Sequence, residues 1–457
     1  MAAPHPATSS SNPSPAHPFP LRAVVISADR WHIDFQGWYG NDWIETPALQ
    51  KLASEGVVFD NCFAACVGPE WTARAWWTGR TQLPRPDAGG PSTWELARLK
   101  SVGVRTVLIT EASAEHIAEV APPFDEVHVV RGEDDLDVSE TETPIAHLVR
   151  RAETWLRDNT HETRPTLLWI RSRGIPLPWL PPRGFADLYL EDFALIPDQS
   201  GPVAGPNEAE VEFPPEVEFP EEDLCEFAEE QDLTPEQARV PEETRFALAM
   251  YASYASLLDR WLGRLLRNLA QDPHAGTTLI LFTTGAGQVF FPGESAPAVD
   301  LAELEGTTPL RGELIQTALI ARLPGCIPGD TDHAGTRRGA LVQSIDLLPT
   351  VTEWLGLPAG NLVEGRSVLP LVRQTSEQIH DELLLGDGEG ALALRTPGEL
   401  YVETPAAEPE GEPVVGLYGK PHDRWDAANL AKQQPGLADE LAARLKARQL
   451  NAPAADT

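Results

Sequence analysis

An aspartate directly follows a buried apolar run near the start of the chain. The run Arg22–Ala28 reads RAVVISA, and Asp29 comes next. Active sites of open parallel sheets lie at the carboxyl ends of their strands, and carboxylate oxygens are the ligands that Ca²⁺ and Mg²⁺ prefer. We therefore expect Asp29 at such an edge, where a hard cation would lie.

Other side chains that could ligate a metal are scattered. His32 and Asp34 lie close to Asp29 in sequence, but the isoleucine between them indicates a turn or short helix. Cys62 and Cys66 could share the face of a helix, but no nearby His or Cys completes a zinc set. A single His is more often packed or solvated than a ligand, so these residues are weaker candidates than Asp29.

The elements that must position these residues follow a regular alternation. Short continuous apolar runs are typical of parallel strands covered on both faces by helices. The predicted strands are Arg22–Ala28, Arg105–Thr110, Thr166–Ile170, Thr277–Thr283 and Thr317–Ala321. The predicted helices are 47–55, with Thr46 as N-cap and Gly56 at its end, Trp94–Val102 and Glu242–Ala270.

This alternation predicts an α/β fold with a doubly wound, mostly parallel sheet over residues 22–375. The sequence pattern changes in residues 376–457, which contain four short apolar runs and a predicted helix near 436–449. This pattern indicates a small C-terminal α+β subdomain. Residues 1–21 are rich in Pro and Ser and predicted to be a disordered tail. A Pro- and Glu-rich stretch at about 198–242 is predicted to be an acidic surface insertion.

A set of short motifs resembles the sulfatases, which belong to the alkaline phosphatase superfamily. The order of the motifs is right over nearly the whole chain after residue 21. They are Val24–Asp29 (VVISAD), Gly37–Gly40 (GWYG), Glu45–Asn61, Trp77–Arg80 (WTGR), Ser344–Pro358 and Glu364–Pro370 (EGRSVLP). The resemblance implies the doubly wound sulfatase fold.

The resemblance also implies a metal site, and here the chain departs from the family. Sulfatases hydrolyse sulfate esters with Ca²⁺, held by an acidic pair after the first strand and by an Asp followed by Asn or His after a later one. The first pair reads Asp29-Arg30, and the later motif places Gly285 and Ala286 at ligand positions. One carboxylate does not satisfy a cation that takes six to eight oxygen ligands. We expect Asp29 to be a vestigial ligand and no cofactor to be bound.

The family's nucleophile is a Cys or Ser, or a Thr or Ser in phosphoesterase relatives, at the start of a helix that ends in Thr-Gly. Here the segment places Pro69 or Glu70 at that position, depending on whether it is aligned on the terminal glycine or on Arg74. A shifted loop could bring Thr72 or Cys66 into place; otherwise Thr72 is an ordinary residue of a helix start.

Cations and aromatic residues remain around the expected site. Arg30, Arg74, Arg171 and Arg173 could hold a small anion bidentately, or they could neutralise Asp29 and neighbouring carboxylates. We favour neutralisation. The chain has 13 tryptophans, several of them near this segment, which could fill a vacated cavity or stack on a sugar ring. We favour cavity filling.

The charge of the chain narrows the range of partners. Lys and Arg total 35 against 69 Asp and Glu, a formal charge of -34, which disfavours binding to nucleic acids and to anionic membrane surfaces. The N-terminus lacks the features of a secretory signal, and no apolar run reaches transmembrane length, so the cytoplasm is the expected location.

Three functional hypotheses follow. The first is a catalytically inactive protein with the sulfatase fold that binds a ligand or a protein. The second is a working metal-dependent sulfuric or phosphoric ester hydrolase, with Ca²⁺ and relocated site residues. The third is an interaction module whose acidic insertion contacts a basic protein partner.

Overall fold

The computed structural model describes most of the chain. The described residues are 20–81, 95–111, 124–194, 242–288, 310–325, 333–358, 360, 363–388, 390–406, 411–424 and 426–451. Nearly all of the predicted N-terminal tail and of the acidic insertion lies outside them, as does the first residue of the helix predicted at Trp94–Val102.

A central sheet forms the larger part of the molecule. Nine of the described strands belong to it, in the order β4-β3-β5-β1-β6-β8-β2-β7, with β9 also paired to β2. The strands are β1 (Arg22–Ala28), β2 (Val57–Phe63), β3 (Arg105–Glu111), β4 (Glu126–Val130), β5 (Thr166–Ser172), β6 (Thr278–Thr284), β7 (Gln316–Thr317), β8 (Leu319–Arg322) and β9 (Thr336–Gln343).

The register of the parallel strands decides which residues meet at the carboxyl edge. β1 lies between β5 and β6, and Ala28 at its end pairs with Ser172 and with Thr284. The residues that follow these three strands are therefore neighbours, although they are far apart in sequence. β8, expected as a further parallel strand, runs antiparallel to both β6 and β2.

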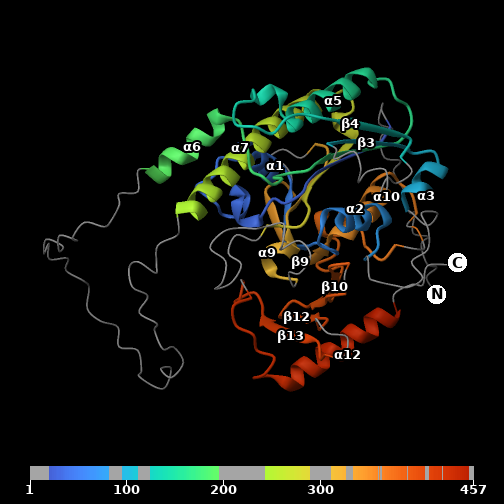
Figure 1. Cartoon of the computed structure of the whole chain (residues 1–457). Coiled ribbons are helices and arrows are strands. Elements are labelled where there is room, and N and C mark those ends of the chain that lie inside the picture. Colours follow the sequence, from blue (N-terminus) through green and yellow to red (C-terminus); the bar gives the residue numbers. More distant parts are fainter. Residues whose placement is uncertain are drawn as a thin grey trace, which may run out of the picture.

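Helices cover both faces of the sheet (Figure 1). They are α1 (Pro47–Glu55), α5 (Pro144–Asp158), α6 (Arg183–Ala194) and α7 (Glu242–Gln271) on one side, and α2 (Pro69–Thr78), α3 (Glu95–Ser101), α10 (Leu347–Trp354) and α11 (Leu369–Val372) on the other. The short helix α9 (Gly312–Ile315) precedes β7, and short 3-10 turns are η1 (Ile33–Phe35), η2 (Gly37–Tyr39), η4 (Glu140–Glu142), η5 (Ala275–Thr277) and η6 (Ser344–Asp346).

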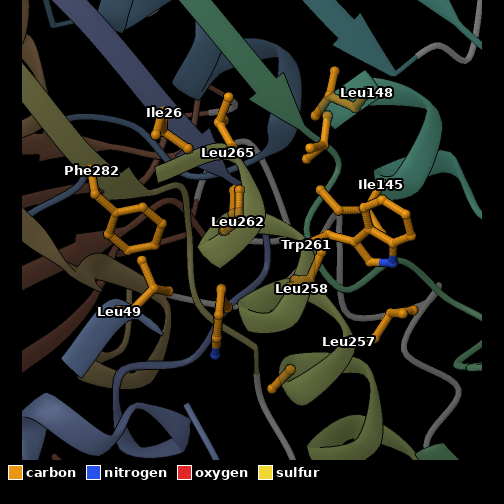
Figure 2. Packing of buried hydrophobic residues seen from close by; sticks show 14 of the residues in the cluster. Ile26, Leu49, Ile145, Leu148, Leu257, Leu258, Trp261, Leu262, Leu265 and Phe282 are labelled. Carbon is orange, nitrogen blue, oxygen red and sulfur yellow. The ribbon is translucent and has the colours of Figure 1, made fainter. Parts of the chain in front are cut away.

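Each face has its own hydrophobic core, because alternate side chains of a strand point to opposite faces. In β1, Val24 and Ile26 join the core under α7, whereas Val25 joins the core under α10. Figure 2 shows the first core, where Leu258 and Leu262 of α7 lie among side chains from the sheet, α1 and α5. The apolar stripe predicted on α7 is therefore core packing.

α1 is capped from another helix. Thr46 precedes α1 as expected, but its side chain makes no capping hydrogen bond. The carboxylate of Asp259, on α7, instead accepts hydrogen bonds from the amides of Ala48 (2.9 Å) and Leu49 (2.8 Å). Burial raises the pKa of Asp259 to about 6 despite these two bonds. The cap therefore ties α1 to α7.

The C-terminal part contains a second, antiparallel sheet with one helix packed on it (Figure 1). The elements are β10 (Leu383–Gly386), β11 (Leu392–Arg395), β12 (Glu399–Thr404), β13 (Val414–Gly419) and α12 (Pro435–Asn451). A parallel bridge between Cys66 and Gly386 joins this sheet to the segment that precedes α2. The prediction that this region combines short strands with a helix in an α+β arrangement is confirmed.

The two cysteines near α2 do not share a helix. Cys62 lies in strand β2 and Cys66 in the bridge to Gly386, so the interpretation that the two share a helix face is wrong. No helix within the described ranges has the length and apolar character needed to cross a membrane.

Candidate functional site

Asp29 lies at the carboxyl edge of the sheet, as the sequence predicts, and its partner is an arginine. The carboxylate is buried, and its Oδ2 accepts a hydrogen bond from Nη2 of Arg171 at 2.7 Å. Arg171 is the residue before the end of β5 and its guanidinium also lies over the ring of Trp77, 5.9 Å from the ring centroid. The other oxygen, Oδ1, is buried and has no hydrogen-bond partner among the described residues.

The loop after β5 also holds the backbone of Asp29. The Asp29 amide donates to the carbonyl of Ser172 (3.3 Å), and the Ile175 amide donates to the carbonyl of Asp29 (3.2 Å). Gly174 has a φ of +68°, and a Cβ at this position would lie 1.5 Å from the Asp29 carbonyl oxygen. A glycine is therefore required here for both conformation and space.

The end of β6 approaches Asp29 from the other side. Gly285 donates its amide to the carbonyl of Ala28 (3.0 Å), and a Cβ on Gly285 would lie 2.4 Å from Oδ1 of Asp29. The carbonyl of Ala286 accepts a hydrogen bond from the amide of Arg30 (3.0 Å). The structure thus brings together Asp29, Arg30, Gly285 and Ala286, as the resemblance implies.

Arg30 has an unusual backbone conformation with φ at +56°. Its carbonyl accepts a hydrogen bond from the hydroxyl of Tyr251 (2.6 Å), which in turn accepts one from the amide of His32 (2.7 Å). His32 is buried, and this burial lowers the pKa of its imidazole to about 3, so the ring is neutral at pH 7. Asp34 forms an ion pair with Arg424. The side chains of both candidate ligands therefore already have partners within the chain.

The segment expected to contain the nucleophile leads into α2. The structure describes only the backbone of Pro69 and Glu70, and this backbone forms the first turn of α2. The hydroxyl of Thr72 is buried and donates to the carbonyl of Cys66 at 2.8 Å. Cys66 is also buried, and burial raises the pKa of its thiol well above the ordinary value. The Thr72 hydroxyl and the Cys66 thiol both lie in the interior.

An aromatic ring lies against the C-terminal sheet beside this segment. A Cβ on Gly388 would lie 2.4 Å from the ring of Trp71, so the ring is in direct contact with the backbone of the loop that follows β10. The guanidinium of Arg74 lies over the same ring, 5.7 Å from the ring centroid. Arg74 therefore stacks on Trp71.

A second buried carboxylate, which the sequence reasoning did not select, lies at the same edge. Glu111 ends β3 and accepts hydrogen bonds from the hydroxyl of Ser172 (3.0 Å) and the amide of Arg173 (3.1 Å). The Arg173 guanidinium pairs with Asp134 (2.5 Å), whose other oxygen accepts a hydrogen bond from Tyr254. Burial raises the pKa of Glu111 to about 7, although Arg173 acts in the opposite direction.

The signal that could have identified Glu111 is the one used for Asp29. It is an acidic residue at the end of a predicted apolar strand, RTVLIT, and so it belongs to the carboxyl edge of the sheet. Arg173 pairs with Glu111 and Asp134, and Arg171 pairs with Asp29. Arg171 thus neutralises the buried carboxylate of Asp29, whereas the pKa of Glu111 stays raised although Arg173 pairs with it.

These residues do not fit the Ca²⁺ site of the sulfatases. In the described part of the chain, no group of three or more His, Cys, Asp or Glu side chains converges closely enough to hold a metal ion. Asp29 contributes one carboxylate, already paired with Arg171, and Gly285 has no side chain. A Ca²⁺ ion takes six to eight oxygen ligands. What the described residues supply at this edge is an ion pair and backbone hydrogen bonds around Asp29.

Comparison with known proteins gives two results at the level of sequence. No family model matches the chain. A multifunctional alkaline phosphatase superfamily protein, PehA of Trinickia caryophylli, is 30% identical over 134 residues. This stretch is 29% of the present chain and 23% of the relative, so the match spans less than a quarter of that protein.

Solved structures match over nearly the full length of both chains. The phosphonate monoester hydrolase of Agrobacterium radiobacter superimposes with a TM-score of 0.65 at 18% identity, covering 95% of this chain and 96% of the other. BT4656, solved with its substrate D-glucosamine-2-N,6-O-disulfate, gives 0.64 at 15% identity, covering 96% and 100%. BT1596, a 2-O GAG sulfatase, gives 0.59 at 16% identity, covering 96% and 95%.

At these identities the structural likeness establishes the fold, including the C-terminal antiparallel sheet. The related stretch of sequence points to the same group of proteins. The chain therefore has the fold of a phosphonate monoester hydrolase and of a 2-O GAG sulfatase, and one stretch of 134 residues is similar in sequence to an alkaline phosphatase superfamily protein.

Proposed function

We propose that this chain is a non-catalytic protein that keeps the sulfatase scaffold and uses it to bind a ligand or a protein. The observation that carries this proposal is the hydrogen-bonded ion pair between Asp29 and Arg171 at 2.7 Å. A carboxylate already neutralised by a guanidinium is a poor ligand for a divalent cation. Without such a cation, the charge that develops on an ester in the transition state lacks its main stabilisation.

The state of the nucleophile segment supports the same proposal. A nucleophile must be reachable by substrate and activated by a base or a lowered pKa. The hydroxyl of Thr72 is 1% exposed and donates to a main-chain carbonyl, and the thiol of Cys66 has a raised pKa. Neither group meets these conditions.

The alternative is a working ester hydrolase that binds Ca²⁺ through relocated residues. The relatives favour it, since one is a phosphonate monoester hydrolase and another a sulfatase. The two proposals differ in metal content and in turnover.

The test combines both properties on the purified full chain. We expect less than stoichiometric Ca²⁺, Mg²⁺, Mn²⁺ or Zn²⁺ by elemental analysis, and no turnover of aryl sulfate, aryl phosphate or aryl phosphonate monoesters above the Asp29→Ala variant. Bound metal at one ion per chain, with turnover that Asp29→Ala or Thr72→Ala abolishes, would establish the hydrolase. Asp187→Ala, an exposed aspartate on α6, controls for a general effect of substitution.

The ligand class is a further part of the proposal. The acidic segment at about 198–242 would contact a basic protein, since its charge favours a partner of opposite sign. Replacing its glutamates by glutamines should lower the affinity for such a partner. The affinity should then also depend less on salt concentration. A small anion at the carboxyl edge is the competing ligand, to be probed with inorganic sulfate and phosphate by calorimetry.

A further inference from the structure

We infer that the guanidinium of Arg171 is a built-in cation that takes the place of the metal at this edge of the sheet. The inference rests on the proposed function in one respect, since a chain that binds Ca²⁺ through Asp29 would contradict both. It goes further because it assigns to Arg171 the role of the cation that neutralises the Asp29 carboxylate.

The first step is the burial of the pair. The side chains of Asp29 and Arg171 are 6% and 16% exposed, and their nearest N and O atoms lie 2.7 Å apart. A carboxylate removed from water must be neutralised by a cation or by protonation. Arg171 supplies that charge from within the chain and from the strand next to β1.

The second step concerns space. A Cβ on Gly285 would lie 2.4 Å from Oδ1 of Asp29, well inside van der Waals contact. Residue 285 therefore has no ligand atom and also no room for one, because the Asp29 carboxylate occupies the volume where a side chain at this residue would begin. Restoring an aspartate at residue 285 would displace Asp29 rather than complete a metal site.

The third step is the way the end of β5 and the loop that follows it hold Asp29. Arg171 contacts the Asp29 side chain, while the Ser172 carbonyl and the Ile175 amide bind its backbone. The Gly174 backbone packs against the Asp29 carbonyl in a space that admits no Cβ. One short segment therefore supplies the charge and fixes the position of the carboxylate that it neutralises.

The inference is tested by thermal unfolding of one single and one double variant of the full chain. Arg171→Met leaves a buried carboxylate without its cation and should lower the Tm by roughly 3–5 °C. Asp29→Asn combined with Arg171→Met removes both charges and should recover most of that loss. Arg183→Ala, which breaks a mostly exposed pair with Asp137, is the matched control and should leave the Tm nearly unchanged.

Chemical rescue gives a second readout. In Arg171→Ala, millimolar methylguanidinium chloride should raise the Tm relative to NaCl at equal ionic strength, and the raise should vanish in the double variant Asp29→Asn/Arg171→Ala. The wild type should respond neither to CaCl₂ nor to EDTA. An unaltered Tm in Arg171→Met, or a Tm of the wild type that rises with CaCl₂, would overturn the inference.

One outcome separates this inference from the proposed function. Ester turnover by the wild type that EDTA does not affect would refute the proposed function and leave the role of Arg171 intact. If Arg171→Met does not fold, the double variant decides. A folded double variant supports the inference, and a double variant that is equally unfolded overturns it.

Discussion

Oδ1 of Asp259 accepts a hydrogen bond from the amide of Leu49, although the two residues are 210 positions apart in sequence. Together with the bond from the Ala48 amide, it satisfies two of the amides that every helix start leaves without an intrahelical partner. The cap belongs to α7, the helix that forms much of the core on this face. The first helix of the fold is therefore completed only when the chain has reached residue 259.

Replacing this cap should destabilise the protein. Asp259→Ala leaves two amides near the start of α1 without an acceptor and should lower the free energy of unfolding by about 1–2 kcal/mol. Chemical denaturation monitored by tryptophan fluorescence measures the change. Asp187→Ala, on the exposed face of α6, should be neutral. Equal stability of the two variants would contradict the capping role.

Gly285 should not tolerate even one added methyl group. In Gly285→Ala the new Cβ would meet Oδ1 of Asp29 at 2.4 Å, so the carboxylate or the loop after β6 must shift. We expect a loss of about 1–3 kcal/mol in unfolding free energy. Gly276→Ala is the matched control, because no atom lies within 4 Å of its added Cβ. The hypothesis fails if both variants unfold alike.

Glu111 should give the stability a defined pH dependence. Its folded pKa of about 7 lies above its ordinary value of 4.5, so folding favours the protonated carboxyl. The contribution is therefore fully present below pH 4.5 and is lost as the pH rises through 7. In Glu111→Gln this loss disappears, and the stability of the variant relative to the wild type should rise by up to about 3 kcal/mol across that window.

The measurement for Glu111 is a series of urea unfolding curves from pH 4.5 to 8. Titration of the other groups cancels in the difference between variant and wild type, provided that Gln does not alter their surroundings. A difference that stays flat over the series would show that Glu111 does not titrate there.

Thr72 should prove structural. Thr72→Val keeps the shape of the side chain but leaves the carbonyl of Cys66 without its buried donor, which should lower the unfolding free energy by about 1–3 kcal/mol. Thr72→Ser keeps the hydroxyl and should lose less. Both variants should match the wild type in the esterase assays, and a selective loss of turnover in Thr72→Val would instead identify a nucleophile.

The sequence predicted the parallel centre of the sheet well, because buried parallel strands are continuous apolar runs. β1 agrees in both bounds, β3 and β5 extend one or two residues further at their ends, and β6 is shifted by one residue at both ends. β4 was missed because Glu126 and His128 interrupt its apolar residues, as suits an edge strand. The sequence could not reveal that β8 runs antiparallel to its neighbours, since an apolar run has the same composition in either orientation.

From the sequence, the site could be predicted only for residues that directly follow a recognisable strand. Asp29 and Gly285 follow apolar strands, so the sheet edge brings them together. The pairing of Arg171 with Asp29 was one of two stated alternatives, because sequence does not reveal which carboxylate an arginine reaches. The contact of Trp71 with Gly388 joins segments more than 300 residues apart, and no local pattern predicts it. The predicted division of the chain at residues 375 and 376 stays a prediction.

The bridge between Cys66 and Gly386 has a practical consequence for producing shorter forms of the protein. The amide of Val67 donates to the Gly386 carbonyl, and the amide of Gly386 donates to the carbonyl of Ala65. A chain that ends at residue 375 would lack both bonds beside the start of α2 and would expose Phe63 of β2 and Leu341 of β9, which pack against Leu383 and Leu385 of β10 in the full chain. Such a fragment should aggregate, and in the full chain the two sheets should unfold in a single calorimetric transition.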